Sequence, residues 1–257
     1  MSRDTIDPRN LSAQGHVTFV DDQTGDEHDS RDLELILTDV QISDPVARRA
    51  EVTIPGRDNT LDLTEALGGV RFERRQVTLS FACVNWTTTR HWHLASTLRN
   101  ALDGRLMRVV LSDDLAFYWL GRCSVEVERP GAEASVVTVT VDADAHKYAI
   151  NSSYDPWQWS PFSFVDGVIT QQADVVLANE TKSVTLPIDP ARLKPTLWLN
   201  VGGSGSVSAR VSTDQEWHPL RSGKNVLPEI RMSDRAETTL LLRGTGRVGV
   251  EYRVGSL

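Results

Sequence analysis

The chain has 257 residues, of which 40% are hydrophobic, and a formal net charge of -8. This length allows two domains of ordinary size, and the hydrophobic content lets each bury a core. The acidity argues against a nucleic-acid-binding protein, because such proteins carry basic patches, and no apolar run is long enough for a membrane helix. The N-terminal MSRDTIDPRN is too polar for a signal peptide, so we expect synthesis and folding in the cytoplasm.

The first predicted elements are a strand, a turn and a second strand. Residues 33–40 form an apolar run that predicts a strand. The pair Pro55-Gly56 is followed by polar residues, which is typical of a tight turn. Apolar and polar residues alternate over 76–81, the period of a strand with one buried face.

The spacing of apolar residues then changes to that of a helix. Leu94, Leu98 and Leu102 recur every four residues and form one apolar stripe. A threonine hydroxyl within 87–88 can cap the start of this helix. Gly104 ends it, because glycine accepts the left-handed conformation that closes a helix.

Three more strands are predicted after the helix, over 107–111, 116–128 and 134–143. Only short breaks separate them, which favours antiparallel neighbours, since a parallel crossover needs a dozen or more residues. We therefore expect one helix among several antiparallel strands, with its leucine stripe packed on the sheet.

The best domain boundary lies at 150–156, where NSSYDP combines small polar residues with proline. This divides the chain into residues 1–149 and 150–257. From 168 to the end, short apolar runs alternate with turn signals, and no segment has the period of a helix. That pattern predicts a β-sandwich.

No motif in the sequence places a catalytic or metal-binding group. His91 and His93 lie two apart on the predicted helix, so they do not face each other and cannot share a metal. Cys83 and Cys123 each lie in an apolar strand. This favours buried free thiols, and a disulfide between them is kept as the alternative. We expect no enzyme activity, no metal and no cofactor.

Two aromatic residues, Trp157 and Trp159, are the remaining candidates for a binding site. Aromatic faces stack on sugars, so these residues suggest carbohydrate binding. Their spacing of two instead favours a strand that buries one face against a domain interface. Both interpretations are kept.

The order of motifs over the first half of the chain resembles the distal tail protein family of long-tailed bacteriophages. The ordered set is IPGR, LDLT, a strand led by Arg74-Arg75, a helix ending in LDG, and the strand YWLGR, with HDSRDLELIL upstream. Asn59 stands where the family often has glycine, but asparagine also tolerates a positive φ. The resemblance covers the N-terminal half.

This resemblance implies a mainly β fold: an N-terminal β-sandwich with one packed α-helix, and a C-terminal galectin-like β-sandwich. It also implies that one part of the N-terminal half reaches over the neighbouring subunit as a belt, without indicating which part.

The implied function is structural. The chain would form a hexameric ring at the virion tail tip, assembled in the host cytoplasm, that joins the tail tube and tape-measure proteins to the tail-hub protein. DNA would cross the ring without specific binding, and no membrane is involved. An acidic lumen would let DNA slide, although ordinary solubility explains the acidity equally well. The alternative function is a carbohydrate-binding adhesion module that acts through the C-terminal sandwich.

Overall fold

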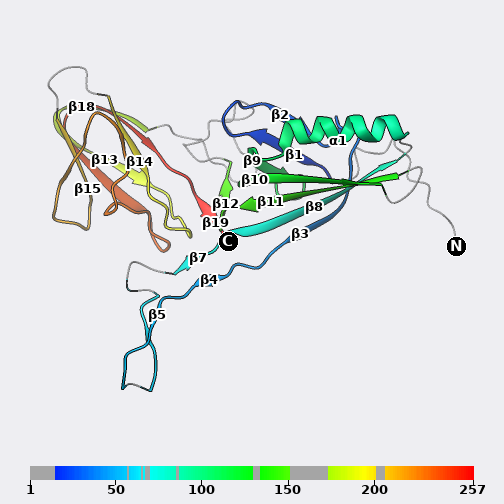
Figure 1. Ribbon diagram of the computed structural model, residues 1–257. Coiled ribbons are helices and arrows are strands. Elements are labelled where there is room, and N and C mark those ends of the chain that lie inside the picture. The colour runs from blue at the N-terminus through cyan, green and yellow to red at the C-terminus, as the bar shows by residue number, and fades with distance from the viewer. Residues whose placement is uncertain are drawn as a thin grey trace. The chain divides into compact units, whose positions relative to one another are not determined.

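The computed structural model shows a mainly β protein with one helix in its described part, and this confirms the predicted fold class (Figure 1). The chain divides into two compact units, residues 1–145 and 146–257. The structure describes residues 15–56, 58–64, 66, 70–84, 87–129, 134–150, 173–200 and 206–257.

The first unit is built on an antiparallel sheet with the strand order β2-β1-β9-β10-β11-β8-β3. Each strand pairs with its neighbour in the antiparallel sense. For β9, β10 and β11 this confirms the expectation from the short breaks in the sequence. The strands are β1 (Val17–Asp21), β2 (Glu27–Asp29), β3 (Ile36–Ile42), β8 (Arg75–Val84), β9 (Leu106–Leu111), β10 (Phe117–Glu128) and β11 (Ala134–Ala143).

The helix α1 (Thr88–Leu102) lies over one face of this sheet (Figure 1). The Thr87 hydroxyl accepts a hydrogen bond from the backbone N–H of Arg90 and caps the first turn. After the helix ends, Gly104 takes a φ of 73°, which is the left-handed region that glycine tolerates best.

The core of the first unit forms between α1 and the sheet. Leu98 and Leu102 are fully buried, and Leu94 is only 4% exposed. They belong to one cluster with the inward-facing residues of β8, such as Leu79 and Phe81. Burial of each large apolar side chain stabilises the fold by roughly 1.5–3 kcal/mol, so this contact is a main source of stability.

The second unit is centred on one long, bent pair of antiparallel strands. Its strands β13 (Ala173–Leu186) and β18 (Thr238–Glu251) pair along their whole length, with a register shift beside Asn179, whose φ is 60°. Opposite this shift, Gly244 has a φ of 132°. The paired strands therefore bend together at one point.

This bend lets β18 join two groups of strands. Its first half pairs with β15 (Val207–Val211), which pairs with β16 (His218–Pro219). Its second half pairs with β14 (Thr196–Asn200), which pairs with β17 (Gly223–Asn225). Leu240 and Val248, from the two halves, are fully buried in the same core cluster. The likeness of this unit to galectins stays a prediction.

The strand β12 (Lys147–Ala149) pairs with the C-terminal β19 (Gly255–Ser256). The domain boundary at 150–156 that the sequence suggested stays a prediction. The linker candidate beyond residue 150 lies outside the described residues.

We predict that Leu98→Ala lowers the free energy of unfolding by ~2–5 kcal/mol, because it opens a cavity between α1 and the sheet. Chemical denaturation measures this loss. Ser96→Ala is the matched control, because Ser96 is exposed on the same helix. Equal stability of the two variants would show that the leucine stripe does not carry the packing.

Gly244→Ala is expected to destabilise the second unit by ~3 kcal/mol, since an added Cβ would collide with the carbonyl oxygen of Ser206 at an unfavourable φ. Gly223→Ala is the control: Gly223 also has a positive φ, of 92°, but a Cβ there meets nothing within 4 Å. Thermal unfolding of both variants separates the collision from the backbone strain. A Gly244→Ala variant as stable as Gly223→Ala would refute the tight approach.

Candidate functional site

The feature that stands out in the first unit is a long excursion between β3 and β8, residues 43–74, which we call the arm. It contains two short ladders: β4 (Ala47–Arg48) with β7 (Arg71–Phe72), and β5 (Glu51–Val52) with β6 (Leu61–Asp62). Figure 1 shows the arm as a continuation of β3 and β8. The predicted turn at Pro55-Gly56 lies at its far end, where Gly56 has a φ of 82°.

The arm exposes apolar side chains that a single copy leaves uncovered. None of its described residues is buried. The exposed fractions of its large apolar residues are 56% for Val46, 45% for Val52, 39% for Ile54, 38% for Leu63 and 40% for Val70. A two-stranded ladder is marginally stable alone, and clustered exposed apolar residues mark an interaction surface. The arm is therefore the best candidate for a contact with another protein.

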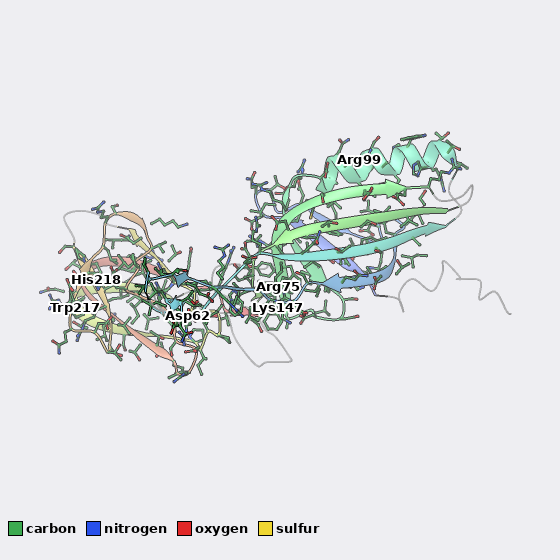
Figure 2. The ribbon with its side chains drawn as sticks, turned by 60° about the horizontal axis from the view of Figure 1, so that its bottom comes forward. Asp62, Arg75, Arg99, Lys147, Trp217 and His218 are labelled. Carbon is green, nitrogen blue, oxygen red and sulfur yellow. The ribbon has the colours of Figure 1, made fainter. Side chains whose placement is uncertain are left out.

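A buried arginine holds the base of the arm. Arg75, the first residue of β8, is labelled in Figure 2. It is 9% exposed and donates a hydrogen bond of 2.8 Å from Nε to the carbonyl oxygen of Ser43. Its guanidinium lies 4.9 Å from the ring centroid of Trp119. Burial lowers the pKa of Arg75, and the charge of Asp44 opposes this. Among the described residues no carboxylate forms a salt bridge with it.

Ser43 is tied down by further bonds at the same place. Its N–H donates to the carbonyl oxygen of Gln76 at 2.9 Å, and its hydroxyl accepts from the N–H of Gln76 at 2.9 Å. Burying a charged group is costly unless its bonds compensate. The charged side chain of Arg75 therefore binds Ser43, the residue where the arm begins. We interpret Arg75 as the residue that fixes the direction of the arm.

The sheet face away from the core forms a second surface, which we call the polar face. It consists of outward-facing polar residues of β3, β8, β11 and β10, each of them half-buried or exposed. Three cross-strand rows build it: Gln41, Thr78, Thr140 and Ser124; Asp39, Ser80, Thr138 and Glu126; and Gln76, Asp142 and Arg122.

The side chains at the centre of the polar face are short and mostly carry hydroxyl groups. The central strands β8 and β11 present serine and threonine, whereas carboxylates stand at Asp39, Glu126 and Asp142. The three rows contain one cation, Arg122, beside these carboxylates. Its guanidinium donates to the carbonyl oxygen of Gly104 at 2.9 Å. Such a face offers a phosphate backbone little attraction, because binding to it depends on lysine and arginine.

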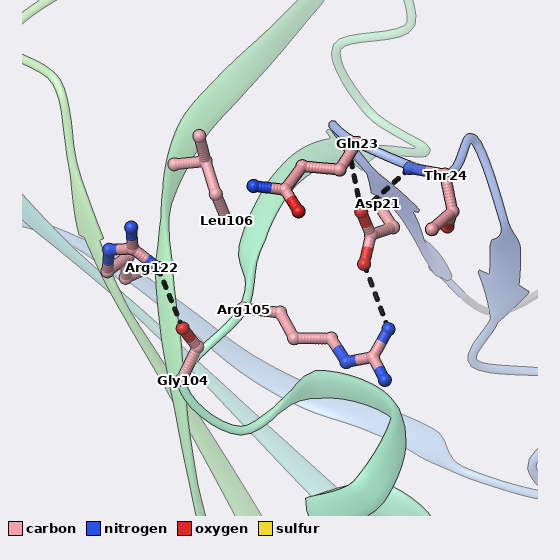
Figure 3. Close-up of a pocket in the computed structure, with 7 residues that line it drawn as sticks. All are labelled: Asp21, Gln23, Thr24, Gly104, Arg105, Leu106 and Arg122. Carbon is pink, nitrogen blue, oxygen red and sulfur yellow. Dashed lines mark hydrogen bonds and ion pairs between the residues drawn. The ribbon is translucent and has the colours of Figure 1, made fainter.

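A pocket of about 370 Å³ lies at the end of α1 (Figure 3). Asp21 in this pocket accepts from the N–H groups of Gln23 at 2.8 Å and Thr24 at 3.1 Å, and from Arg105 at 3.0 Å. The bond from Gln23 does most to hold the pKa of Asp21 below its usual range; Thr24 and Arg105 act the same way, against burial. Both oxygens of this carboxylate already accept hydrogen bonds, so we interpret Asp21 and Arg105 as a structural ion pair and not as a binding site.

The structure brings together one pair of chemically active groups that the sequence did not predict. Nδ1 of His91 lies 2.9 Å from the hydroxyl of Ser135 on β11. Both residues are buried, at 5% and 1% exposure, so the pair ties α1 to the sheet and no substrate reaches it. Only the sequence distance between them hid this pair.

The cysteines and the metal-ligand types form no site in the described residues. Cys83 and Cys123 are free and buried, and burial raises the pKa of each thiol to about 12. No group of three or more His, Cys, Asp or Glu side chains among the described residues is arranged to hold a metal. In the same part of the chain, α1 is too short and polar to cross a membrane.

The sequence-derived site residues fall in three places. Leu94, Leu98 and Leu102 are core residues of the first unit, and Gly104 follows α1 directly. Pro55 and Gly56 lie far from them along the arm. Trp157 and Trp159 lie outside the described residues, so their assignment to a carbohydrate site or an interface stays a prediction.

No protein-family model and no curated protein matches the sequence. Among solved structures, the chain is similar to the crystal structure of the SPP1 Dit (gp 19.1) protein, described as a paradigm of the hub adsorption apparatus in phages that infect Gram-positive bacteria. The TM-score is 0.56 at 13% identity, and the match covers 94% of this chain and 99% of the SPP1 protein. This chain has the fold of a phage Dit protein.

Two structures of the phage p2 baseplate in its activated conformation, with Sr and with Ca, give weaker matches. Their TM-scores are 0.38 and 0.35, each at 8% identity. They cover 95% and 89% of this chain, and 98% of each matched chain. At these TM-scores they add nothing to the fold assignment, which depends on the SPP1 protein.

Replacing Arg75 by methionine keeps much of the apolar volume but removes the bond to Ser43. We predict that Arg75→Met speeds amide hydrogen exchange at Ser43 and Gln76 by ~10-fold to ~100-fold, the effect of losing a charged hydrogen bond. Arg74→Met is the control, because Arg74 binds Asp142 at 3.0 Å on the exposed surface instead. Equal protection in both variants would show that Arg75 does not hold the arm.

Proposed function

We propose that the chain is a structural protein of a bacteriophage tail tip and assembles into a closed hexameric ring. The observation that carries this proposal is the arm of exposed apolar residues on a Dit fold. The SPP1 Dit protein, which shares this fold, is described as part of a hub adsorption apparatus. A ring of identical copies needs two different, complementary patches on each copy, and the arm supplies one of them.

The arm of each copy packs its apolar side chains against the neighbouring copy. We therefore assign the arm as the belt that the family resemblance implies. The contact is heterologous, because the arm of each copy occupies a surface of the next. Arg75 fixes the direction in which the arm leaves the sheet, and this direction sets the angle between neighbouring copies. The ring-forming contacts thus belong to residues 1–149.

The polar face lines the central channel of the proposed ring. Its serine and threonine rows give DNA a hydrated, weakly interacting wall, and its carboxylates repel the phosphates. DNA therefore passes without specific binding. The net charge of -8 supports this role, because an acidic protein repels phosphate groups.

The ring joins the tail tube and tape-measure proteins on one side to the tail-hub protein on the other. It is assembled in the host cytoplasm and ends at the virion tail tip. The role is that of a connector, so no catalysis, cofactor or membrane is required. The second unit is free of the ring contacts and is available for other tail proteins or for a surface ligand.

Light scattering of the intact chain and of arm variants tests this proposal. The intact chain should have six times the mass of the monomer. The double variant Val46→Asp, Val52→Asp should fall to a monomer with an unchanged melting temperature, because carboxylates cannot be buried in the contact. Val176→Asp is the control, since Val176 is an exposed valine of the second unit, with 58% exposure. It should still form the ring.

Two outcomes would contradict the proposal. If the intact chain is a monomer at tens of micromolar, it does not close a ring by itself. If the double variant assembles as the intact chain does, the ring does not use the arm.

A further inference from the structure

The outer surface of α1 carries an exposed tryptophan in contact with a buried neighbour. Trp92 is 63% exposed, and its ring meets the ring of His91 edge-on, with 5.2 Å between the two centroids. His91 is itself buried and bound to the hydroxyl of Ser135 on the sheet. The edge contact favours one orientation of the Trp92 ring. An aromatic side chain that is already ordered loses little entropy when a partner covers it.

The helix around Trp92 is basic, although the chain as a whole has a net charge of -8. The 15 residues of α1 include Arg90 and Arg99 but no aspartate or glutamate. Ser96 and Arg99 follow Trp92 by four and seven residues, so these three side chains share one face of the helix. All three are exposed, and Arg99, labelled in Figure 2, forms no salt bridge with a described residue. We call Trp92, Ser96 and Arg99 the Trp92 face.

The far half of the arm, residues 50–64, has the complementary chemistry, and we call it the arm tip. Its exposed large apolar residues are Val52, Ile54 and Leu63. Its charged residues are three carboxylates and one arginine: Glu51, Asp58, Asp62 and Arg57. The three carboxylates are exposed. The arm tip is therefore apolar and acidic, whereas the Trp92 face is aromatic and basic.

A closed ring also needs a surface that receives the arm. Outside β3 and the arm, the described part of the first unit exposes two large apolar side chains, Trp92 and Leu115, each by 63%. Leu115 directly follows Asp113 and Asp114, and these carboxylates would repel an acidic arm tip. The three rows of the polar face contain no large apolar side chain. Of these surfaces, only the Trp92 face matches the arm tip in both polarity and charge.

We propose that the arm tip of one copy docks on the Trp92 face of the next copy. This inference rests on the proposed ring and specifies the second of its two complementary surfaces. The apolar side chains of the arm tip cover the Trp92 ring, and its carboxylates lie near Arg99. Because α1 packs on the sheet face opposite to the polar face, this contact leaves the proposed channel wall uncovered.

Cross-linking of cysteine variants tests the contact between copies. Val52→Cys and Ser96→Cys chains are co-expressed, purified and treated with a short bis-maleimide. Cross-linked dimers should form from this mixture and from neither variant alone, because the contact joins two different surfaces. Cys83 and Cys123 do not interfere, since both are buried and burial raises the pKa of each thiol to about 12. As the control, Ser124→Cys on the polar face replaces Ser96→Cys and should give no dimer.

Truncation of the tryptophan measures how much the aromatic contact contributes to assembly. Trp92→Ala should raise the protein concentration at which half of the rings dissociate by at least ~10-fold, as the loss of a central aromatic contact does. Leu115→Ala is the matched control, because Leu115 is equally exposed in the same unit, and it should leave this concentration unchanged. Trp92 is exposed, so the circular dichroism of Trp92→Ala should match that of the intact chain. Equal dissociation of both variants would contradict the proposal.

The mass of the intact chain separates a failure of this contact from a failure of the ring. If rings form and the arm links to Ser124→Cys, the arm docks on the polar face instead. If rings form and the arm links to neither partner, the receiving surface lies elsewhere. Both results overturn the docking on the Trp92 face and leave the ring standing. If the intact chain is a monomer and no link forms, the ring and the docking fail together.

Discussion

The first unit depends on the burial of one leucine stripe against one face of one sheet. Leu94, Leu98 and Leu102 lie on one face of α1, and the inward residues of β8, β10 and β11 provide the surface they need. Because α1 covers that face, the other face of the same strands is left to solvent, and strand alternation makes it polar. The core and the polar face therefore both follow from the alternation of apolar and polar residues along these strands.

The arm is the part of the first unit that this pattern does not explain. Its ladders are too short to bury anything within one copy, and its valines and leucine stay exposed. The fold nevertheless fixes the start of the arm with Arg75, a buried charge that lacks a carboxylate partner in the described residues. A chain that keeps such a costly residue at the base of an uncovered apolar segment is built to present that segment in one direction.

Much of the fold could be predicted from the sequence, because periodicity reports local structure and burial together. The four-residue spacing of the leucines placed α1, and alternation over 76–81 placed β8. The Pro55-Gly56 turn was visible as well. Its position at the end of a long arm was not, because the strands on either side are two residues long and carry little periodic signal.

Contacts between distant segments are what the sequence could not supply. His91 and Ser135 stand in separate elements, and only the packing of α1 on β11 brings them within hydrogen-bond distance. The contacts of Arg210 and Arg243 with Trp217 are similar: the three residues come from three segments, and the register of β15 and β18 brings only the two arginines together. Nothing in the sequence around Trp217 and His218 predicts that two arginines will lie over the tryptophan ring.

The most direct measurement of the central claim is negative-stain electron microscopy of the purified chain. The proposed function predicts closed six-fold rings with an open channel at the centre. Isolated monomers, two-fold dimers or open filaments would contradict the account, because each would show that the arm does not close the contacts of one copy onto the next.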